Sequence, residues 1–158
     1  MRSVLIFCLF LVNTFARCQY THYEAIDCLC ATADEILLVN VIEDKPDIWW
    51  SSLATCFSDT KAAVTETFKV TRFSGAHEVE FRRLMDCVDT LLFPKEKLLK
   101  VGQSYIIFLS SSRPVANSHI GQVKYVVSDY ILGVQELNDD LYRHLKWWQE
   151  QRERLKKK

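Results

Sequence analysis

The sequence predicts a mainly β protein: a five-stranded, OB-fold-like closed barrel with a C-terminal α-helix. Three observations support this class. Short segments with strand patterning recur along the chain, with turn residues between them. The last segment has the apolar periodicity of an amphipathic helix. The length of 158 residues suits a single domain. Five strands and one packed helix in this order fit a small closed barrel.

The strand patterning falls in five segments, which are residues 34–43, 63–73, 77–82, 105–109 and 122–132. The first is dense in β-branched residues and is expected to be a buried strand. The second and third alternate, and the turn residues between them predict a hairpin. A long connection is expected over residues 44–60. Pro94 excludes a central strand in the segment that precedes 105–109.

The C-terminal helix is expected over about residues 138–157. Asn138 is a suitable N-cap, and the two aspartates after it suit the positive end of the helix dipole. The apolar stripe of this helix consists of Leu141, Leu145, Trp148 and Leu155.

The N-terminus has the layout of a secretory signal peptide, expected over residues 1–18. A short basic start precedes an apolar run over residues 4–12, which is too short for a membrane span. The product is therefore expected to be secreted and extracellular, with no membrane span. Cleavage after Cys18 leaves four cysteines, whereas the alternative, cleavage after Ala16, leaves five. An even set is simpler under oxidising conditions, and residues 19–158 then form one domain.

The mature chain would hold Cys28, Cys30, Cys56 and Cys87. A Cys28–Cys30 bridge would close a strained ring, which leaves two pairings. One joins Cys28 to Cys87 and Cys30 to Cys56, and the other joins Cys28 to Cys56 and Cys30 to Cys87. Either pairing would contribute about 3–4 kcal/mol per bridge. A four-cysteine zinc site is the alternative, but the ligand spacing is unusual for one.

Two further features each have two interpretations. Trp49 and Trp50, within the expected connection, either fold back over the barrel or form an exposed tip that binds a partner, since tryptophan is enriched at interface hot spots. The basic tail over residues 152–158 is either a solvated helix end or a contact for a heparin-like or matrix polyanion.

Patterns for catalysis or cofactor binding are not found in the sequence. The four histidines lie far apart, and neither a Gly-x-Ser-x-Gly motif nor a glycine-rich phosphate loop is present. The formal net charge is zero, which favours neither nucleic acid nor a membrane surface. The sequence therefore predicts a binding protein rather than an enzyme, with no catalytic residues, no metal, no cofactor and no nucleic-acid partner.

Several short motifs follow one another along the chain in a characteristic order. They are Cys28-Leu29-Cys30 before the first strand, the opening of that strand at 33–38, Phe68-Lys69-Val70 followed by Phe73-Ser74-Gly75, Cys87 after the third strand, the 101–108 strand, and 128–131 before the final helix. Together these motifs resemble the netrin-like (NTR) module, which tissue inhibitors of metalloproteinases, netrins and complement C-termini share. The resemblance covers about residues 28–150.

The resemblance implies an OB-fold, a Cys28–Cys87 bridge and an extracellular protein partner. In the metalloproteinase inhibitors, the Cys-x-Cys element stands at the mature N-terminus, where the free amine and first carbonyl chelate the protease zinc. Here residues 19–27 precede Cys28, unless Cys18 takes the leading place. Ser128 stands where family members often carry a cysteine, and a Cys30–Cys56 bridge would compensate.

Two functions follow as hypotheses. The first is a metalloproteinase inhibitor whose binding wedge is Cys28, Leu29 and Cys30, with Trp49 and Trp50 nearby. The second is a non-inhibitory extracellular binding or matrix-interaction module. The residues ahead of Cys28 favour it, as do cysteine positions that differ from those of the metalloproteinase inhibitors.

Overall fold

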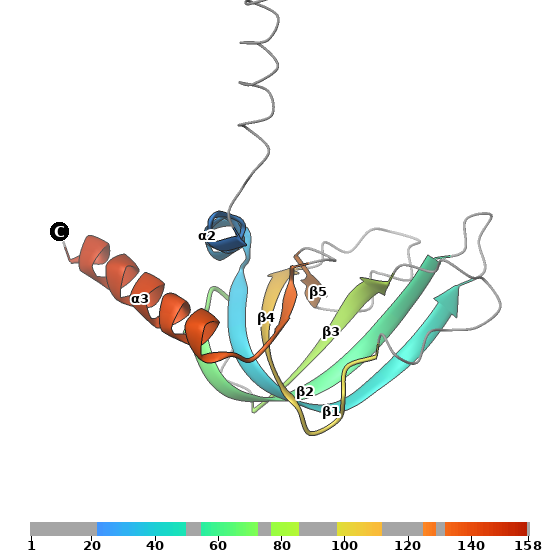
Figure 1. The fold of residues 1–158 in the computed structure, drawn as a ribbon. Coiled ribbons are helices and arrows are strands. Elements are labelled where there is room, and N and C mark those ends of the chain that lie inside the picture. The colour runs from blue at the N-terminus through green and yellow to red at the C-terminus, as the bar shows by residue number, and fades with distance from the viewer. Residues whose placement is uncertain are drawn as a thin grey trace, which may run out of the picture.

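The part of the chain that the structure describes contains six strands and two helices, and both helices lie on the same side of the strands (Figure 1). The computed structural model describes residues 22–49, 55–72, 77–85, 98–111, 125–128 and 132–157, so the expected signal peptide lies outside it. In chain order the elements are α2 (His22–Thr32), β1 (Glu35–Trp49), β2 (Thr55–Lys69), β3 (Glu78–Met85), β4 (Ser104–Ser111), β5 (Tyr125–Val127), β6 (Val134–Glu136) and α3 (Asp139–Lys156).

Five of these strands close into a barrel. Their order is β1-β2-β3-β5-β4, and β4 pairs back with β1. Every pairing around the barrel is antiparallel except that of β3 with β5. β5 and β6 both pair with the same edge of β4. β6 pairs with the first half of β4, and β5 pairs with its last residues. The predicted class is confirmed: a mainly β, OB-fold-like closed barrel with a C-terminal helix.

The barrel interior is filled by one cluster of buried side chains. Successive residues of a strand point to opposite faces, so β1 and β4 each contribute alternate residues. The members of this inner cluster are Leu37, Val39, Val41, Ala62, Val79, Phe81, Tyr105, Ile107, Leu109 and Tyr125. The interior is therefore a packed core.

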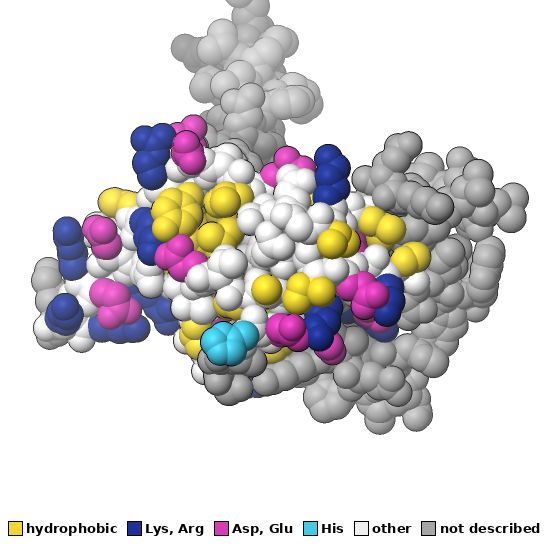
Figure 2. Space-filling model, turned by 90° about the horizontal axis from the view of Figure 1, so that it is seen from below, with side chains coloured by type: hydrophobic (Ala, Val, Ile, Leu, Met, Phe, Trp, Pro, Cys, Tyr) yellow, Lys and Arg dark blue, Asp and Glu magenta, His cyan; other side chains and the backbone are white. Residues whose placement is uncertain are grey.

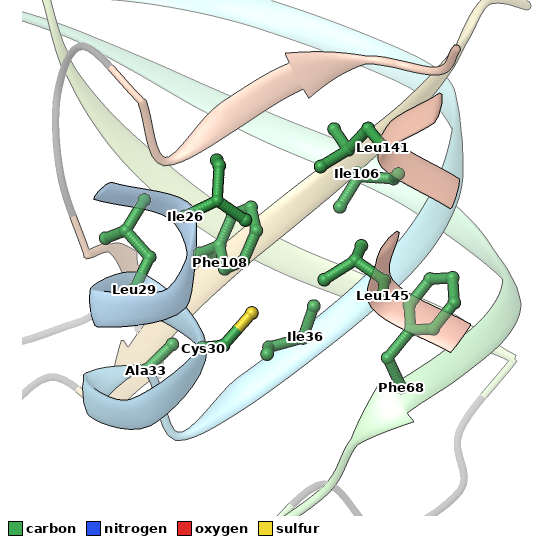
Figure 3. Close-up of a cluster of buried hydrophobic side chains, with 10 residues drawn as sticks. All are labelled: Ile26, Leu29, Cys30, Ala33, Ile36, Phe68, Ile106, Phe108, Leu141 and Leu145. Carbon is green, nitrogen blue, oxygen red and sulfur yellow. The ribbon is translucent and has the colours of Figure 1, made fainter. Parts of the chain in front are cut away.

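The intervening residues of β1 and β4 face outwards and are covered by the two helices (Figure 3). The members of this outer cluster are Ile26, Leu29, Cys30, Ala33, Ile36, Phe68, Ile106, Phe108, Leu141 and Leu145. β1 and β4 are thus buried on both faces here. Continuous apolar runs, rather than alternation, are the pattern that such strands need.

β1 and β2 are longer than the sequence predicts, and the expectation of a connection over 44–60 is wrong. β1 runs on to Trp49, and β2 begins at Thr55. Asp44 is tolerated inside the sheet because Thr60 Oγ1 donates to its carboxylate at 2.7 Å. Pro46 is tolerated because β1 pairs with β4 only as far as Asn40, and a proline suits a strand edge.

Opposite charges face each other across the outward side of β1, β2 and β3. Asp59 lies opposite both Lys45 and Arg82, and Lys61 lies opposite both Glu43 and Glu80. Such cross-strand pairs favour this register. On the face seen in Figure 2, hydrophobic side chains lie in small groups with charged side chains between them.

Helix α3 begins as the sequence predicts, because Asn138 Oδ1 accepts a hydrogen bond from the Leu141 backbone N–H at 2.9 Å. Its apolar stripe is shorter than expected. Leu141 and Leu145 are buried and Trp148 is half-buried, but Leu155 is 72% exposed. The stripe loses its partners where α3 extends beyond the barrel (Figure 1).

Candidate binding surface

The predicted partner-binding motif lies in a helix rather than in an extended segment. Cys28, Leu29 and Cys30 belong to α2, which the sequence analysis did not predict. Residues two apart on a helix point about 200° apart. Cys28 is accordingly exposed, whereas the side chain of Cys30 is fully buried and its sulfur points into the outer cluster (Figure 3). Leu29 is also buried, so the motif presents one side chain to a partner instead of an edge.

The backbone carbonyls of this motif already accept hydrogen bonds from within the chain. Thr32 Oγ1 donates to the carbonyl of Cys28 at 2.8 Å, and the backbone N–H of Ala33 donates to that of Leu29 at 2.8 Å. Lys69 Nζ, from the end of β2, donates to the carbonyl of Cys30 at 3.0 Å. The C-terminal end of α2 is therefore capped internally.

The two cysteines of α2 are free thiols in this structure. Burial, followed by the nearby carboxylate of Asp27, raises the pKa of the Cys30 thiol to about 12. A thiol with so high a pKa stays protonated at neutral pH and is a poor nucleophile and metal ligand. The function of Cys30 in this structure is therefore packing.

The fold does not bring Cys56 near either cysteine of α2. Cys56 pairs with Ile48 and Met85 at the start of β2, whereas Phe68, near the other end of β2, packs in the same cluster as Cys30. The strand between them spans about 40 Å at ~3.3 Å per residue, and a bridge needs Cα atoms within about 7 Å. Cys87 and the side chain of Cys56 lie outside the described residues, so the predicted Cys28–Cys87 bridge stays a prediction.

The backbone of Trp49, one of the two tryptophans predicted to bind a partner, lies away from the cysteine motif. Trp49 is the last residue of β1, whereas α2 packs on the first residues of that strand. The side chain of Trp49 and the whole of Trp50 lie outside the described residues. Whether the five predicted partner-binding residues share one surface therefore stays a prediction, while the described backbone places Trp49 and the cysteine motif at opposite ends of β1.

Three polar contacts fix α3 in place. Glu66 on β2 accepts a hydrogen bond from the Tyr142 hydroxyl at 2.9 Å and pairs with the Lys146 ammonium, which explains why an acid interrupts the apolar face of β2. At the other side of α3, His144 Nε2 lies 2.8 Å from Asp27 Oδ1 of α2. The two helices thus form one layer over β1 and β4.

This layer displays a tryptophan that the sequence analysis did not single out. The Trp147 side chain is 53% exposed and its ring lies beside that of His144, with 5.8 Å between centroids. Trp147 lies off the apolar stripe of α3, and this position in the sequence could have indicated that its side chain is exposed. We call the area formed by Asp27, His144 and Trp147 the α2–α3 surface.

Within the described ranges, no group of three or more His, Cys, Asp or Glu side chains could hold a metal ion. Neither described helix is both long and apolar enough to cross a bilayer. No family model, curated protein or solved structure matches the chain. The surface and its chemistry are therefore the basis for any functional proposal.

Proposed function

We propose that the chain is a secreted binding module whose α2–α3 surface engages an extracellular protein. The observation that carries this proposal is the half-exposed Trp147. A large aromatic side chain gains free energy when a partner covers it, and tryptophan is among the residues that dominate interface energetics.

The setting of Trp147 supports the same proposal. Tyr142 and Lys146 hold α3 on β2 through Glu66, and His144 holds it on α2 through Asp27. Trp147 therefore lies on a helix segment that is fixed from two sides. A partner that binds it pays little for ordering the helix, and such preorganisation increases affinity.

Secretion is part of the proposal and rests on the signal-peptide pattern over residues 1–18. It is tested by expressing the full chain in cells with a secretory pathway and sequencing the N-terminus of the product in the medium. We expect a mature chain that begins at Gln19. A product retained in the cytosol, with Met1 intact, would contradict secretion.

Metalloproteinase inhibition is the second candidate, favoured by the position of Cys28-Leu29-Cys30 directly before the first strand. The helical state of the motif argues against it, because the carbonyl of Cys28 already accepts a hydrogen bond from Thr32. Chelation of a protease zinc would require the end of α2 to unwind. We expect no inhibition when the purified protein is titrated to micromolar levels against secreted metalloproteinases, and inhibition at nanomolar levels would reverse this preference.

A photo-crosslinking amino acid tests the binding surface. One variant carries it at Trp147, and a matched control carries it at Val101, which is 68% exposed in the turn before β4. We expect an extracellular protein to be captured from position 147 and not from position 101.

The captured protein is then titrated with two further variants. Trp147→Ala should weaken binding about 30-fold, as for a hot spot worth about 2 kcal/mol. Val101→Ala should leave the Kd within about twofold, as expected outside a hot spot. Equal weakening by both variants, or by neither, would refute the α2–α3 surface as the binding site.

A further inference from the structure

Helix α3 continues past its last hydrophobic contact with the outer cluster. Its buried residues, Leu141 and Leu145, lie in its first half, and the half-buried Trp148 is the last that packs on the outer cluster. The residues from Gln149 to Lys156 add about 12 Å of helix at 1.5 Å per residue. Figure 1 shows this end of α3 standing away from the barrel.

This outer half of α3, which we define as residues 149–157, is rich in cations. It contains Arg152, Arg154, Lys156 and Lys157 but, as acids, only Glu150 and Glu153. Figure 2 shows Lys and Arg side chains around this end of the molecule. Lys156 and Glu153 form an ion pair at 2.8 Å and neutralise each other. The other three cations outnumber the one other acid, so this half carries a positive excess. The helix dipole accounts for cations in the last turn, but Arg152 lies before that turn.

The charge of Arg152 also acts on a cation of the barrel, Lys69, whose ammonium donates to the carbonyls of Cys30 and Ala31. The positive charge of Arg152, after burial, lowers the pKa of the Lys69 ammonium, whereas Asp34 and Glu35 act in the opposite sense. Two like charges held near one another repel. The Arg152 guanidinium lies over the Trp148 ring, 5.7 Å from its centroid, so this cation is already positioned for an anion.

The distribution of the cations around the helix indicates the kind of anion. Arg152 and Arg154 point about 200° apart, and Lys156 and Lys157 point about 100° apart. A flat anionic membrane would contact one side of the helix. A flexible polyanionic chain can contact several sides of a projecting end, and arginine pairs well with planar or tetrahedral oxyanions.

We therefore propose that the outer half of α3 binds a sulfated polysaccharide chain of the extracellular matrix. The proposal rests on the secretion of the chain, because such polymers are extracellular, but not on the protein partner of the α2–α3 surface. It assigns to this chain a second, separate ligand.

Heparin dodecasaccharide is the probe, titrated calorimetrically into the full mature chain. The test variant is Arg154→Ser/Lys157→Ser. The matched control is Lys45→Ser/Lys61→Ser, which removes the same charge from the outward side of β1 and β2. We expect the test variant to weaken binding about 25-fold, or about fivefold per cation, and to reduce the salt dependence of the Kd. The control should stay within about twofold.

Three results would overturn the proposal. The first is equal weakening by the test and control variants. The second is equal affinity for chemically desulfated heparin, which would mean that sulfate is not recognised. The third is wild-type binding to phosphatidylcholine–phosphatidylserine vesicles but not to heparin, which would assign this helix end to a lipid surface. Far-UV circular dichroism confirms that each variant is folded. Because the titration uses purified protein, its outcome is independent of secretion and of crosslinking at position 147.

Discussion

Lys69 Nζ donates to the carbonyl oxygen of Cys30 at 3.0 Å and to that of Ala31 at 3.0 Å. One side chain at the end of β2 thus closes the C-terminal end of α2, a helix that lies far from it in sequence. The ammonium also suits the negative end of the helix dipole. This contact ties the outer helix layer to the barrel.

Replacement of this lysine should loosen α2. Lys69→Met keeps the apolar stem but removes the donor, and we expect the free energy of unfolding to fall by about 1 kcal/mol. The measurement is urea denaturation followed by circular dichroism. The control, Lys61→Met, breaks an exposed ion pair with Glu78 and should leave the free energy of unfolding nearly unchanged, because exposed ion pairs contribute little. Equal losses would show that the cap has no special role.

The two cysteines of α2 should differ in reactivity. In the native protein we expect iodoacetamide to modify the exposed Cys28 and to leave Cys30 unmodified until the protein unfolds, because Cys30 is buried and its thiol has a pKa of about 12. Peptide mass spectrometry gives the modified site. If Cys28 reacts only after reduction, it is not a free thiol in the protein, and the predicted bridge to Cys87 is supported.

The high pKa of Cys30 should also make stability fall at alkaline pH. In the unfolded chain this thiol ionises near pH 8.5, whereas in the folded protein it keeps its proton up to about pH 12. The unfolded state therefore binds fewer protons in this range, and the free energy of unfolding decreases as pH rises through it. Cys30→Ala should remove this component, which urea titrations at pH 8 and pH 10 would detect as a shrinking difference between variant and wild type.

Asp44 should be among the most sensitive polar residues of the barrel. Its side chain is 1% exposed, pairs with Arg83 at 2.7 Å, and accepts the Leu99 backbone N–H at 2.7 Å. Asp44→Ala removes the carboxylate from beside a largely buried guanidinium, so we expect a loss of about 3–5 kcal/mol. Glu43→Ala, one residue earlier and exposed in an ion pair with Lys45, should cost less than about 1 kcal/mol.

Asp34 should contribute to acid sensitivity. The backbone N–H and hydroxyl of Ser111 donate to its carboxylate at 2.7 and 2.8 Å and lower its pKa. A carboxyl with a lowered folded-state pKa stabilises the fold above its unfolded value, near 3.9, and this contribution is lost as pH falls through its folded pKa. Asp34→Asn should flatten the loss of stability between pH 5 and pH 2, and Ser111→Ala should flatten it in part. An unchanged acid profile in both variants would contradict this account.

The local patterns that gave correct predictions share one property: a short range of sequence contains the whole signal. Asn138 followed by two aspartates starts a helix because the cap and dipole interactions lie within one turn. The hairpin of β2 and β3 follows from two alternating segments around a turn. Helix α2 was not predicted, although Ile26, Leu29 and Cys30 follow helical spacing.

The candidate site was less predictable, because it depends on which elements meet. Cys28, Leu29 and Cys30 are adjacent in sequence, yet the helix sends two of them into the core and one to solvent. Trp147 and Trp148 are neighbours in α3, and only the contact of the helix with the barrel leaves Trp147 as the more exposed of the two.

The sequence by itself determined the mainly β class, the hairpin and the C-terminal helix with its cap. These depend on periodicity, turn chemistry and composition, which are local. The tertiary structure decided that β1 and β2 continue through Asp44 and Pro46, that α2 closes over the barrel, and that the outer half of α3 projects. Each of these depends on partners distant in the chain: a buried carboxylate needs donors from other strands, and an apolar stripe is buried only as far as the surface opposite it extends.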